Sequence, residues 1–145
     1  MNNQSVGVEA EHLFKEMLHD YKIAYEYVND WYDFKVGYMY ESLDSKENFE
    51  RKHIKVDVKS ARISIKCTSK RTSQSYVIGR FQFTEEQISN KIWVALYIRW
   101  DDKFIFLGFL KLDGNNHKYL SIHKAREENL LSINEFKEIL REKQT

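Results

Sequence analysis

Residues 54–67 read IKVDVKSARISIKC, and apolar residues alternate with polar ones along most of this stretch. The even-numbered positions from 54 to 58 are apolar, whereas the odd-numbered positions from 55 to 59 are charged. In an extended chain these two sets point to opposite faces. The alternation resumes from Ile63 to Cys67. The stretch therefore predicts two strands, or one bent strand, with Asp57 and Lys59 side by side on the face opposite the core.

The preceding sequence predicts a helix and then a strand. An amphipathic helix is expected from about Val8 to Tyr21, because apolar residues recur there at helical spacing. Aromatic and apolar residues alternate with polar ones from Tyr32 to Tyr38, which is typical of a half-buried strand. The polar segment from Glu41 to Lys52 is expected to be a turn or hairpin loop.

The sequence after residue 80 predicts a short helix, two strands and a last helix. In residues 84–90, Gln87 follows Thr84 by three positions, which is the spacing of a capping box. Residues 92–100 and 104–112 are strongly apolar and predict two strands joined by a tight turn. A second capping box starts the last helix near Ser132. We therefore expect an α/β fold, a single domain over residues 1–145, with a mixed central β-sheet flanked by helices.

The composition limits the class of protein. The chain has 145 residues, of which 42% are hydrophobic and 14% aromatic, which supports a filled core rather than intrinsic disorder. A net charge of +1 excludes a uniformly basic surface. The single cysteine, Cys67, permits no intramolecular disulfide, and a reducing cytoplasm is expected. No secretion signal and no run of roughly 18 to 20 apolar residues are recognisable, so no membrane association is expected.

Basic residues are concentrated in one window. Residues 51–80 contain nine Lys or Arg and one acid, a net charge of +8, which leaves −7 for the rest of the chain. Together with the hydroxyl-rich run at 67–76, this window is typical of a surface that contacts phosphate and sugar. The candidate nucleic-acid contacts in it are Arg62, Lys66, Lys70, Arg71 and Arg80. A merely solvated basic face is the alternative.

The lone acid in this window is followed by a lysine two residues later. The acid-x-Lys pattern occurs seven times in the chain and carries little information by itself. Only Asp57 and Lys59 combine it with a strand-like alternation, the basic window and a preceding strand that bears an acid, Asp33. An ordinary ion pair on an exposed face would also explain this pair.

Three segments in this order resemble the PD-(D/E)xK nuclease superfamily, whose members carry a Glu on a first helix, an Asp on a strand and (D/E)xK on the next. The segments are GVEAEHLFKEML (7–18), WYDFKV (31–36) and IKVDVKSA (54–61), and the resemblance covers roughly residues 7–112. It implies a restriction-endonuclease-like αβββαβ core and a metal-dependent DNA endonuclease that hydrolyses phosphodiester bonds. The chain departs from the family pattern because no proline precedes Asp33, the tripeptide begins with Asp, and the following helix is short.

The resemblance also implies a role for each site residue. Asp33 and Asp57 would bind Mg²⁺ or Mn²⁺, with the carbonyl of Val58 as a third ligand. Lys59 would orient or deprotonate the attacking water and offset charge on the phosphate. Glu11 would bind a second metal ion, directly or through water.

Two assignments have alternatives. At 100° per residue, Glu11 lies on the flank of the apolar stripe of the first helix and Glu9 points to solvent, which favours Glu11. In a competing register Asp57 would be the first acid and Ser64–Lys66 a degenerate tripeptide, although serine is a poor metal ligand.

The expected partners are DNA and a second copy of the chain. One active site cuts one strand, and the apolar surplus in residues 104–112 offers a surface for a homodimer. The rival interpretation is a non-catalytic nucleic-acid-binding or protein-interaction module on a degenerate nuclease fold.

Overall fold

The computed structural model describes residues 3–38, 49, 52–67 and 75–143, with side chains for 7–38, 49, 52–63 and 79–143. Its main feature is a five-stranded sheet with strand order β1-β2-β3-β7-β8. The strands are β1 (Ile23–Tyr27), β2 (Phe34–Tyr38), β3 (Ile54–Arg62), β7 (Trp93–Trp100) and β8 (Lys103–Lys111). Strands β3 and β7 are parallel, and the other neighbours are antiparallel. The prediction of a mixed sheet is confirmed.

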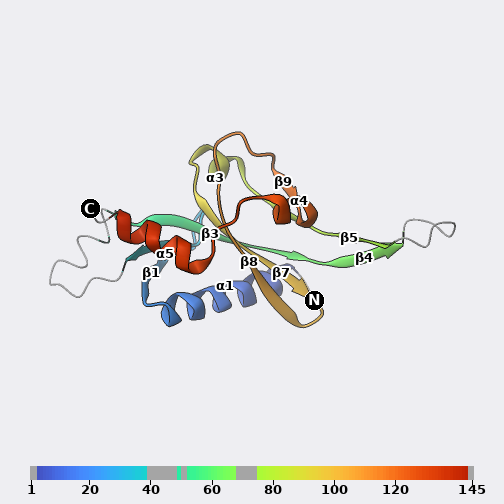
Figure 1. Ribbon diagram of the computed structural model, residues 1–145, viewed down its shortest axis with the longest axis horizontal. Helices are drawn as coiled ribbons and strands as arrows, with labels where there is room; N and C mark the ends of the chain where they lie inside the picture. Colours follow the sequence, from blue (N-terminus) through green and yellow to red (C-terminus); the bar gives the residue numbers. More distant parts are fainter. Residues whose placement is uncertain (1–2, 39–48, 50–51, 68–74, 144–145) are drawn as a thin grey trace.

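Helices cover both faces of this sheet (Figure 1). On one face lie α1 (Asn3–Asp20) and α5 (Ile133–Glu142), whose apolar residues share a core with Phe34 and Val56. On the other face, α3 (Glu85–Ser89) and α4 (Ile122–Glu127) pack against residues that include Leu96. The chain is thus an α/β protein with two hydrophobic cores, one on each side of the sheet.

The two predicted capping boxes set the starts of α3 and α5. Gln87 N donates to Thr84 Oγ1 at 3.1 Å, and Thr84 N donates to Gln87 Oε1 at 3.1 Å. At α5 the same reciprocal bonds join Ser132 and Glu135, at 3.0 and 3.1 Å. Each box satisfies backbone N–H groups that the first helical turn leaves without a partner. Both predicted helix starts are confirmed.

The aromatic stretch before residue 39 contains two strands where the sequence predicted one. Strand β1 pairs with β2 as an antiparallel hairpin, and β2 begins at Phe34 rather than Tyr32. Asn29, with φ of 54°, turns the chain between them in a left-handed conformation that asparagine tolerates better than most residues. Helix α1 also begins five residues before the predicted Val8. Alternation alone did not reveal the hairpin because both strands are rich in aromatics.

Two small sheets were not predicted. Residues 54–67 form two strands, β3 and β4 (Ser64–Cys67), and β4 pairs with β5 (Ser75–Ile78) in a hairpin that projects from the body (Figure 1). Strand β6 (Arg80–Gln82) pairs with β9 (Tyr119–Ser121). The alternation of residues 63–67 predicted β4, whereas β5, β6 and β9 have three or four residues each, too few for a periodic pattern to be recognised. The predicted loop from Glu41 lies largely outside the described residues.

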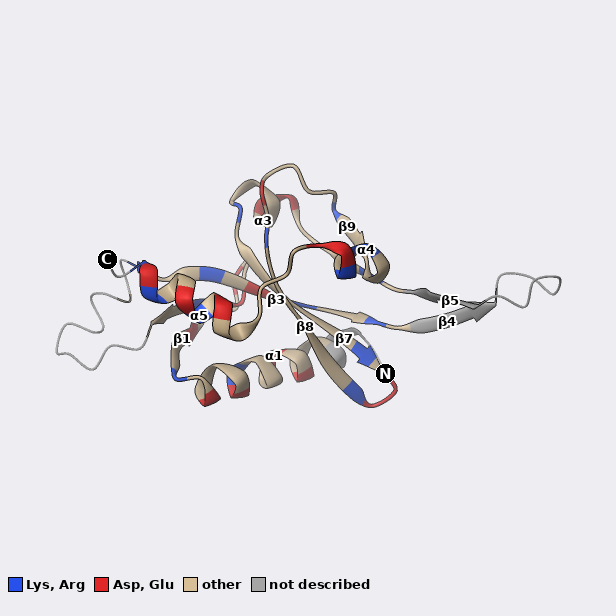
Figure 2. Cartoon of the chain, viewed as in Figure 1, with Lys and Arg blue, Asp and Glu red and all other residues tan. Residues whose placement is uncertain are grey.

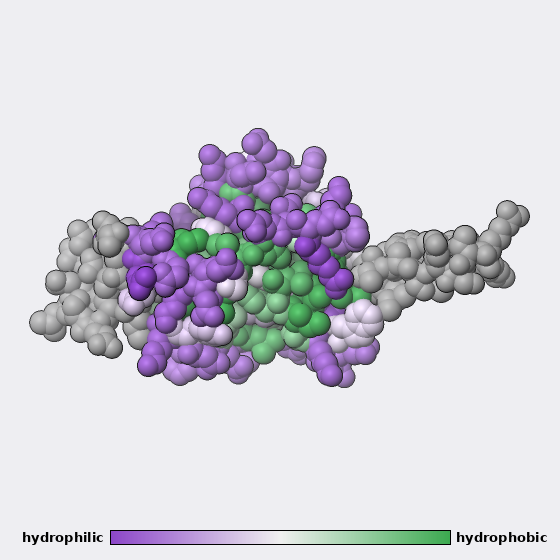
Figure 3. Space-filling view, viewed as in Figure 1, coloured by the Kyte–Doolittle hydropathy of each residue, from purple (hydrophilic) through white to green (hydrophobic). Residues whose placement is uncertain are grey.

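Charged and apolar side chains are separated on the surface. Lys and Arg are spaced along β3 on either side of Asp57, α1 carries mainly acidic residues, and α5 carries residues of both signs (Figure 2). One face exposes apolar surface between α1 and α5 (Figure 3). A cavity of about 670 Å³ between α1 and the β7–β8 hairpin is lined by Val8, Leu13 and Phe104 among others. In the described part of the chain, no helix combines the length and the apolar character that crossing a bilayer requires.

Candidate active site

The site begins where the β2–β3 ladder ends. The last paired residues are Phe34 and Val56, and beyond them the Asp33 carboxylate takes the place of a backbone partner. The N–H of Val58 donates to Asp33 Oδ2 at 2.8 Å. Because the N–H and C=O of one residue in a strand point toward the same neighbour, the carbonyl of Val58 also points to the side that Asp33 occupies.

Asp57 and Lys59 lie on β3 next to this point and form an ion pair. Lys59 Nζ is 2.9 Å from Asp57 Oδ2, and the two side chains are 18% and 8% exposed. Val56 and Val58 pack on the opposite face of β3, in the core with α1 and α5. The structure thus brings the acid and the ammonium together on one face, and it places them in a largely buried environment rather than on an exposed face.

The two aspartates perturb each other. Burial raises the pKa of Asp57 to about 7, with a further contribution from the charge of Asp33, although Lys59 opposes the shift. Burial also raises the pKa of Asp33, and hydrogen bonds from Asp57 and from the Val58 N–H oppose that shift. A hydrogen bond between the two carboxyl groups lowers the pKa of Asp33 and raises that of Asp57, so the two groups titrate as a coupled pair. A cation beside the pair would favour the ionised form of both carboxyls.

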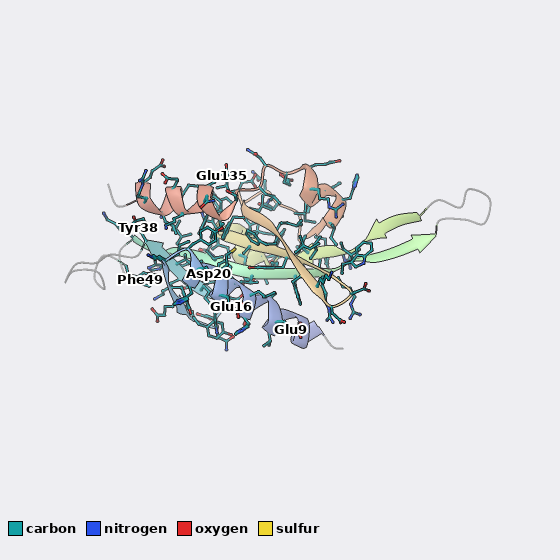
Figure 4. All side chains as sticks on the ribbon, turned by 60° about the horizontal axis from the view of Figure 1, so that its bottom comes forward. Glu9, Glu16, Asp20, Tyr38, Phe49 and Glu135 are labelled. Carbon is teal, nitrogen blue, oxygen red and sulfur yellow. The ribbon has the colours of Figure 1, made fainter. Side chains whose placement is uncertain are left out.

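Glu11 reaches the same site from α1. Its carboxylate raises the pKa of Asp33 through its charge and through a hydrogen bond. Tyr27 on β1 has a pKa raised by burial and then by the charges of Glu11 and Asp33, and its hydroxyl is hydrogen-bonded to Glu11. Glu9 is exposed, as are Glu16 and Asp20 along the same helix (Figure 4). Of the two glutamates considered from the sequence, Glu11 is the one that lies beside Asp33, and we call Glu11, Asp33 and Asp57 the acidic cluster.

The loop that carries Asp33 is anchored by α3. Gln87 is 3% exposed, and its Nε2 donates to the carbonyl of Trp31 at 2.9 Å. Within the loop, Val28 N donates to the carbonyl of Asp33 at 2.8 Å. Sequence reasoning recognised Gln87 only as a capping residue, because its second hydrogen bond joins residues 56 positions apart.

The donor set suits a hard divalent cation. Asp33, Asp57 and the carbonyl of Val58 offer oxygen ligands, and Mg²⁺ in proteins often completes its shell with water. Within the described ranges, no three His, Cys, Asp or Glu side chains are grouped as a ready-made metal centre. Two carboxylates with one carbonyl are therefore the set that could hold Mg²⁺ or Mn²⁺, and Glu11 lies beside it.

The competing register is not supported by the arrangement. Ser64–Lys66 belongs to β4, in a separate two-stranded sheet, and its side chains are not among those described. Asp33 instead occupies the position beside Asp57.

The predicted nucleic-acid contacts are only partly described. Arg62 is exposed at the end of β3, and strand alternation places it on the face opposite Asp57 and Lys59. Arg80 is exposed on β6, with its guanidinium 4.0 Å from the centre of the Tyr119 ring. Of the remaining predicted contacts, the side chain of Lys66 and the whole of Lys70 and Arg71 lie outside the described residues.

Comparisons of the chain with protein-family models, with curated proteins and with solved structures found no match.

Proposed function

We propose that this protein is a metal-dependent DNA endonuclease that hydrolyses phosphodiester bonds at the acidic cluster and Lys59. The observation that carries the proposal is the buried pair of carboxylates, Asp33 and Asp57, with Lys59 beside Asp57 and Glu11 of α1 beside Asp33. These residues are far apart in the sequence, and the carboxylates repel one another when ionised. Buried acidic groups with such perturbed pKa values are more frequent at functional sites than elsewhere.

The arrangement of the elements supports the proposal independently of the charges. Among the strands of the five-stranded sheet and the helices on it, α1, β1, β2, β3, α3 and β7 follow in the order αβββαβ, and the short strands β4, β5 and β6 lie between β3 and α3. This is the order that the resemblance to PD-(D/E)xK nucleases implies. Glu11 lies on the first helix and the Asp57–Lys59 pair on a strand, as the resemblance implies, whereas Asp33 lies in the loop directly before β2.

Each residue has a chemical task in the proposed reaction. Asp33 and Asp57 would hold Mg²⁺ or Mn²⁺ with the Val58 carbonyl, and such an ion activates water and stabilises charge on a phosphate. Lys59, at 2.9 Å from Asp57, orients the attacking water and offsets charge on the phosphate. Glu11 would hold a second cation or a water molecule, and Tyr27 lies beside Glu11.

A second copy of the chain belongs to the proposal, because the described part of each chain has one such cluster and cleavage of both strands of a duplex needs two. The apolar surface of Figure 3 and the exposed side chains of Val8 (64%) and Ile105 (49%) support a homodimer. Light scattering after gel filtration is expected to give twice the mass of the 17.5 kDa chain.

The test is cleavage of plasmid, linear, single-stranded and four-way-junction DNA with Mg²⁺ or Mn²⁺. Asp57→Asn keeps the size of the side chain and removes its charge, and Asp30→Asn alters an exposed acid in the neighbouring loop as a control. Cleavage that needs both the metal ion and Asp57, and that survives Asp30→Asn, supports the proposal. Failure of the wild-type chain to cut any substrate, with DNA binding retained in EDTA, would replace it with a non-catalytic binding protein.

A further inference from the structure

A second charged feature lies at the beginning of β3 and β7. A cavity of about 310 Å³ is lined by four lysines from four different parts of the fold, and we call it the lysine pocket. These are Lys55 on β3, Lys91 before β7, Lys111 at the end of β8 and Lys143 after α5. No acidic residue lines the cavity in the described part of the chain. The basic window of the sequence contains only the first of them.

Within the residues that the structure describes, no acidic side chain neutralises the four lysines. None of them forms an ion pair with a carboxylate of the described residues. Lys55 instead lies over two aromatic rings, with Nζ 5.1 Å from the centre of Trp31 and 5.4 Å from that of Tyr32. Like charges around one cavity repel one another, and an anion in the cavity removes that cost. Lysine ammonium groups bind phosphate as point charges.

The lysine pocket adjoins the acidic cluster. Lys55 and Asp57 are two residues apart on the same face of β3, which corresponds to about 7 Å along a strand. This length is comparable to the distance between neighbouring phosphates of one strand, which recur about every 3.4 Å along the axis of B-DNA and are farther apart along the winding backbone. A nucleic-acid strand at the acidic cluster would therefore bring a neighbouring phosphate to the pocket.

We propose that the lysine pocket binds a backbone phosphate of the nucleic acid, a short way along the strand from the phosphate at the acidic cluster. This inference rests on the proposed function for the choice of ligand, and it adds a binding site formed by Lys91, Lys111 and Lys143 that the sequence did not suggest. In this inference the lysine pocket raises the affinity for the nucleic acid and positions its strand, and the acidic cluster catalyses the hydrolysis.

The test compares two double variants of equal charge. Lys111→Gln with Lys143→Gln removes two exposed lysines of the pocket, and Lys103→Gln with Lys124→Gln removes two exposed lysines elsewhere. Lys91 is left unchanged because its φ is 52°, and Lys55 because it packs on the loop before Asp33. Binding of a fluorescent duplex of about 30 base pairs is measured by anisotropy in EDTA at several KCl concentrations.

We expect the pocket variant to bind about 10-fold more weakly near 0.1 M KCl, with a salt slope smaller by about one to two. The control variant should remain within about twofold of wild type. Urea unfolding checks that both variants are folded. Equal losses in the two variants would overturn the inference, because they would indicate a general effect of charge, and so would unchanged binding by the pocket variant.

A free phosphate ion offers the lysine pocket the same ligand chemistry as a backbone phosphate, so the two ligands must be distinguished. Titration calorimetry with inorganic phosphate tests it on the wild-type chain and on the pocket variant. Phosphate binding that the variant loses, together with unchanged DNA binding, would overturn the inference in favour of a free-anion site. Because DNA binding is read in EDTA, loss of binding by the pocket variant supports the lysine pocket even where the wild-type chain cuts no DNA, an outcome that contradicts only the nuclease proposal.

Discussion

The acidic cluster and the lysine pocket begin two residues apart on β3, at Asp57 and Lys55, yet the charges of the two regions differ in their exposure to solvent. Asp57 is 6% exposed, and its pKa is raised to about 7 by burial and by Asp33. The lysines of the pocket line an open cavity, and Lys91, Lys111 and Lys143 are exposed to solvent. One region concentrates negative charge away from water, and the other presents positive charge to it.

This difference determines what each region responds to. Buried charges interact through a medium of low effective dielectric, so protons and metal ions govern the acidic cluster and salt affects it little. Charges at the surface are screened, so salt governs the lysine pocket. Changes in the cluster should therefore alter the rate and its dependence on pH and metal, whereas changes in the pocket should alter affinity and its dependence on salt.

The largest effect is expected from the two aspartates. Asp33→Asn and Asp57→Asn should each lower the single-turnover cleavage rate with Mg²⁺ by at least about 10³-fold, because each removes a metal ligand. The double variant should be no slower than the slower single variant, since residues that act as a unit are not additive. Multiplied losses in the double variant would show that the two carboxylates act separately. DNA binding in EDTA should be retained by all three.

Replacement of Lys59 should have the next largest effect. Lys59→Met should slow cleavage by about 10²- to 10³-fold, because it removes the ammonium group proposed to orient or deprotonate the attacking water. Lys59 lowers the pKa of Asp57, so without it that pKa rises further. The acidic limb of the pH–rate profile should then move to higher pH. An unchanged profile, with the rate lowered, would mean that Lys59 does not interact with Asp57 during the reaction.

The stability of the metal-free protein should depend on pH through Asp57. Between its ordinary pKa of 3.8 and the folded value of about 7, the folded state binds more protons than the unfolded state. The free energy of unfolding therefore falls as the pH rises through this range. Asp57→Asn should flatten the slope and stabilise the metal-free protein at pH 8 by about 1–3 kcal/mol. Urea unfolding at pH 5 and pH 8 measures both; a variant less stable than wild type at pH 8 would contradict this.

A smaller effect is expected from the anchor of the Asp33 loop. Gln87→Glu keeps the acceptor of the capping box but loses the Nε2 donor to the carbonyl of Trp31, and it should slow cleavage about 10-fold. Thr84→Ala removes the cap and leaves that donor, so it should reduce stability by about 1 kcal/mol with little change in rate at 25 °C. Equal rates for the two variants would show that α3 only stabilises the fold.

Much of this arrangement could be predicted from local patterns. The alternation around Asp57 predicted which side chains share a face, and helix geometry selected Glu11 over Glu9, because periodicity fixes direction along a single element. The capping boxes predicted the starts of α3 and α5 for the same reason. The hairpin of β1 and β2 was missed because aromatic residues occupy both strands. The proposed αβββαβ core rests on the family resemblance rather than on composition.

What could not be predicted depends on contacts between distant elements. The link from Gln87 to Trp31 joins α3 to the Asp33 loop, and no local pattern contains it. The lysine pocket gathers Lys91, Lys111 and Lys143 from three segments that are each unremarkable in charge. The basic window of the sequence instead suggested Arg62 as a nucleic-acid contact, and strand alternation places Arg62 on the face opposite Lys59. Only the fold determines which charges meet.

The most direct test of the central claim is calorimetric titration of the DNA-free chain with Mn²⁺ at pH 6, in two buffers of different ionisation enthalpy. If the acidic cluster is a cation site, the wild-type chain should bind Mn²⁺ and release about one proton, since metal ligands must be deprotonated and the pKa of Asp57 is about 7. Asp57→Asn should abolish both the binding and the proton release. Mn²⁺ binding of equal affinity in the variant, or none in the wild-type chain, would contradict the account.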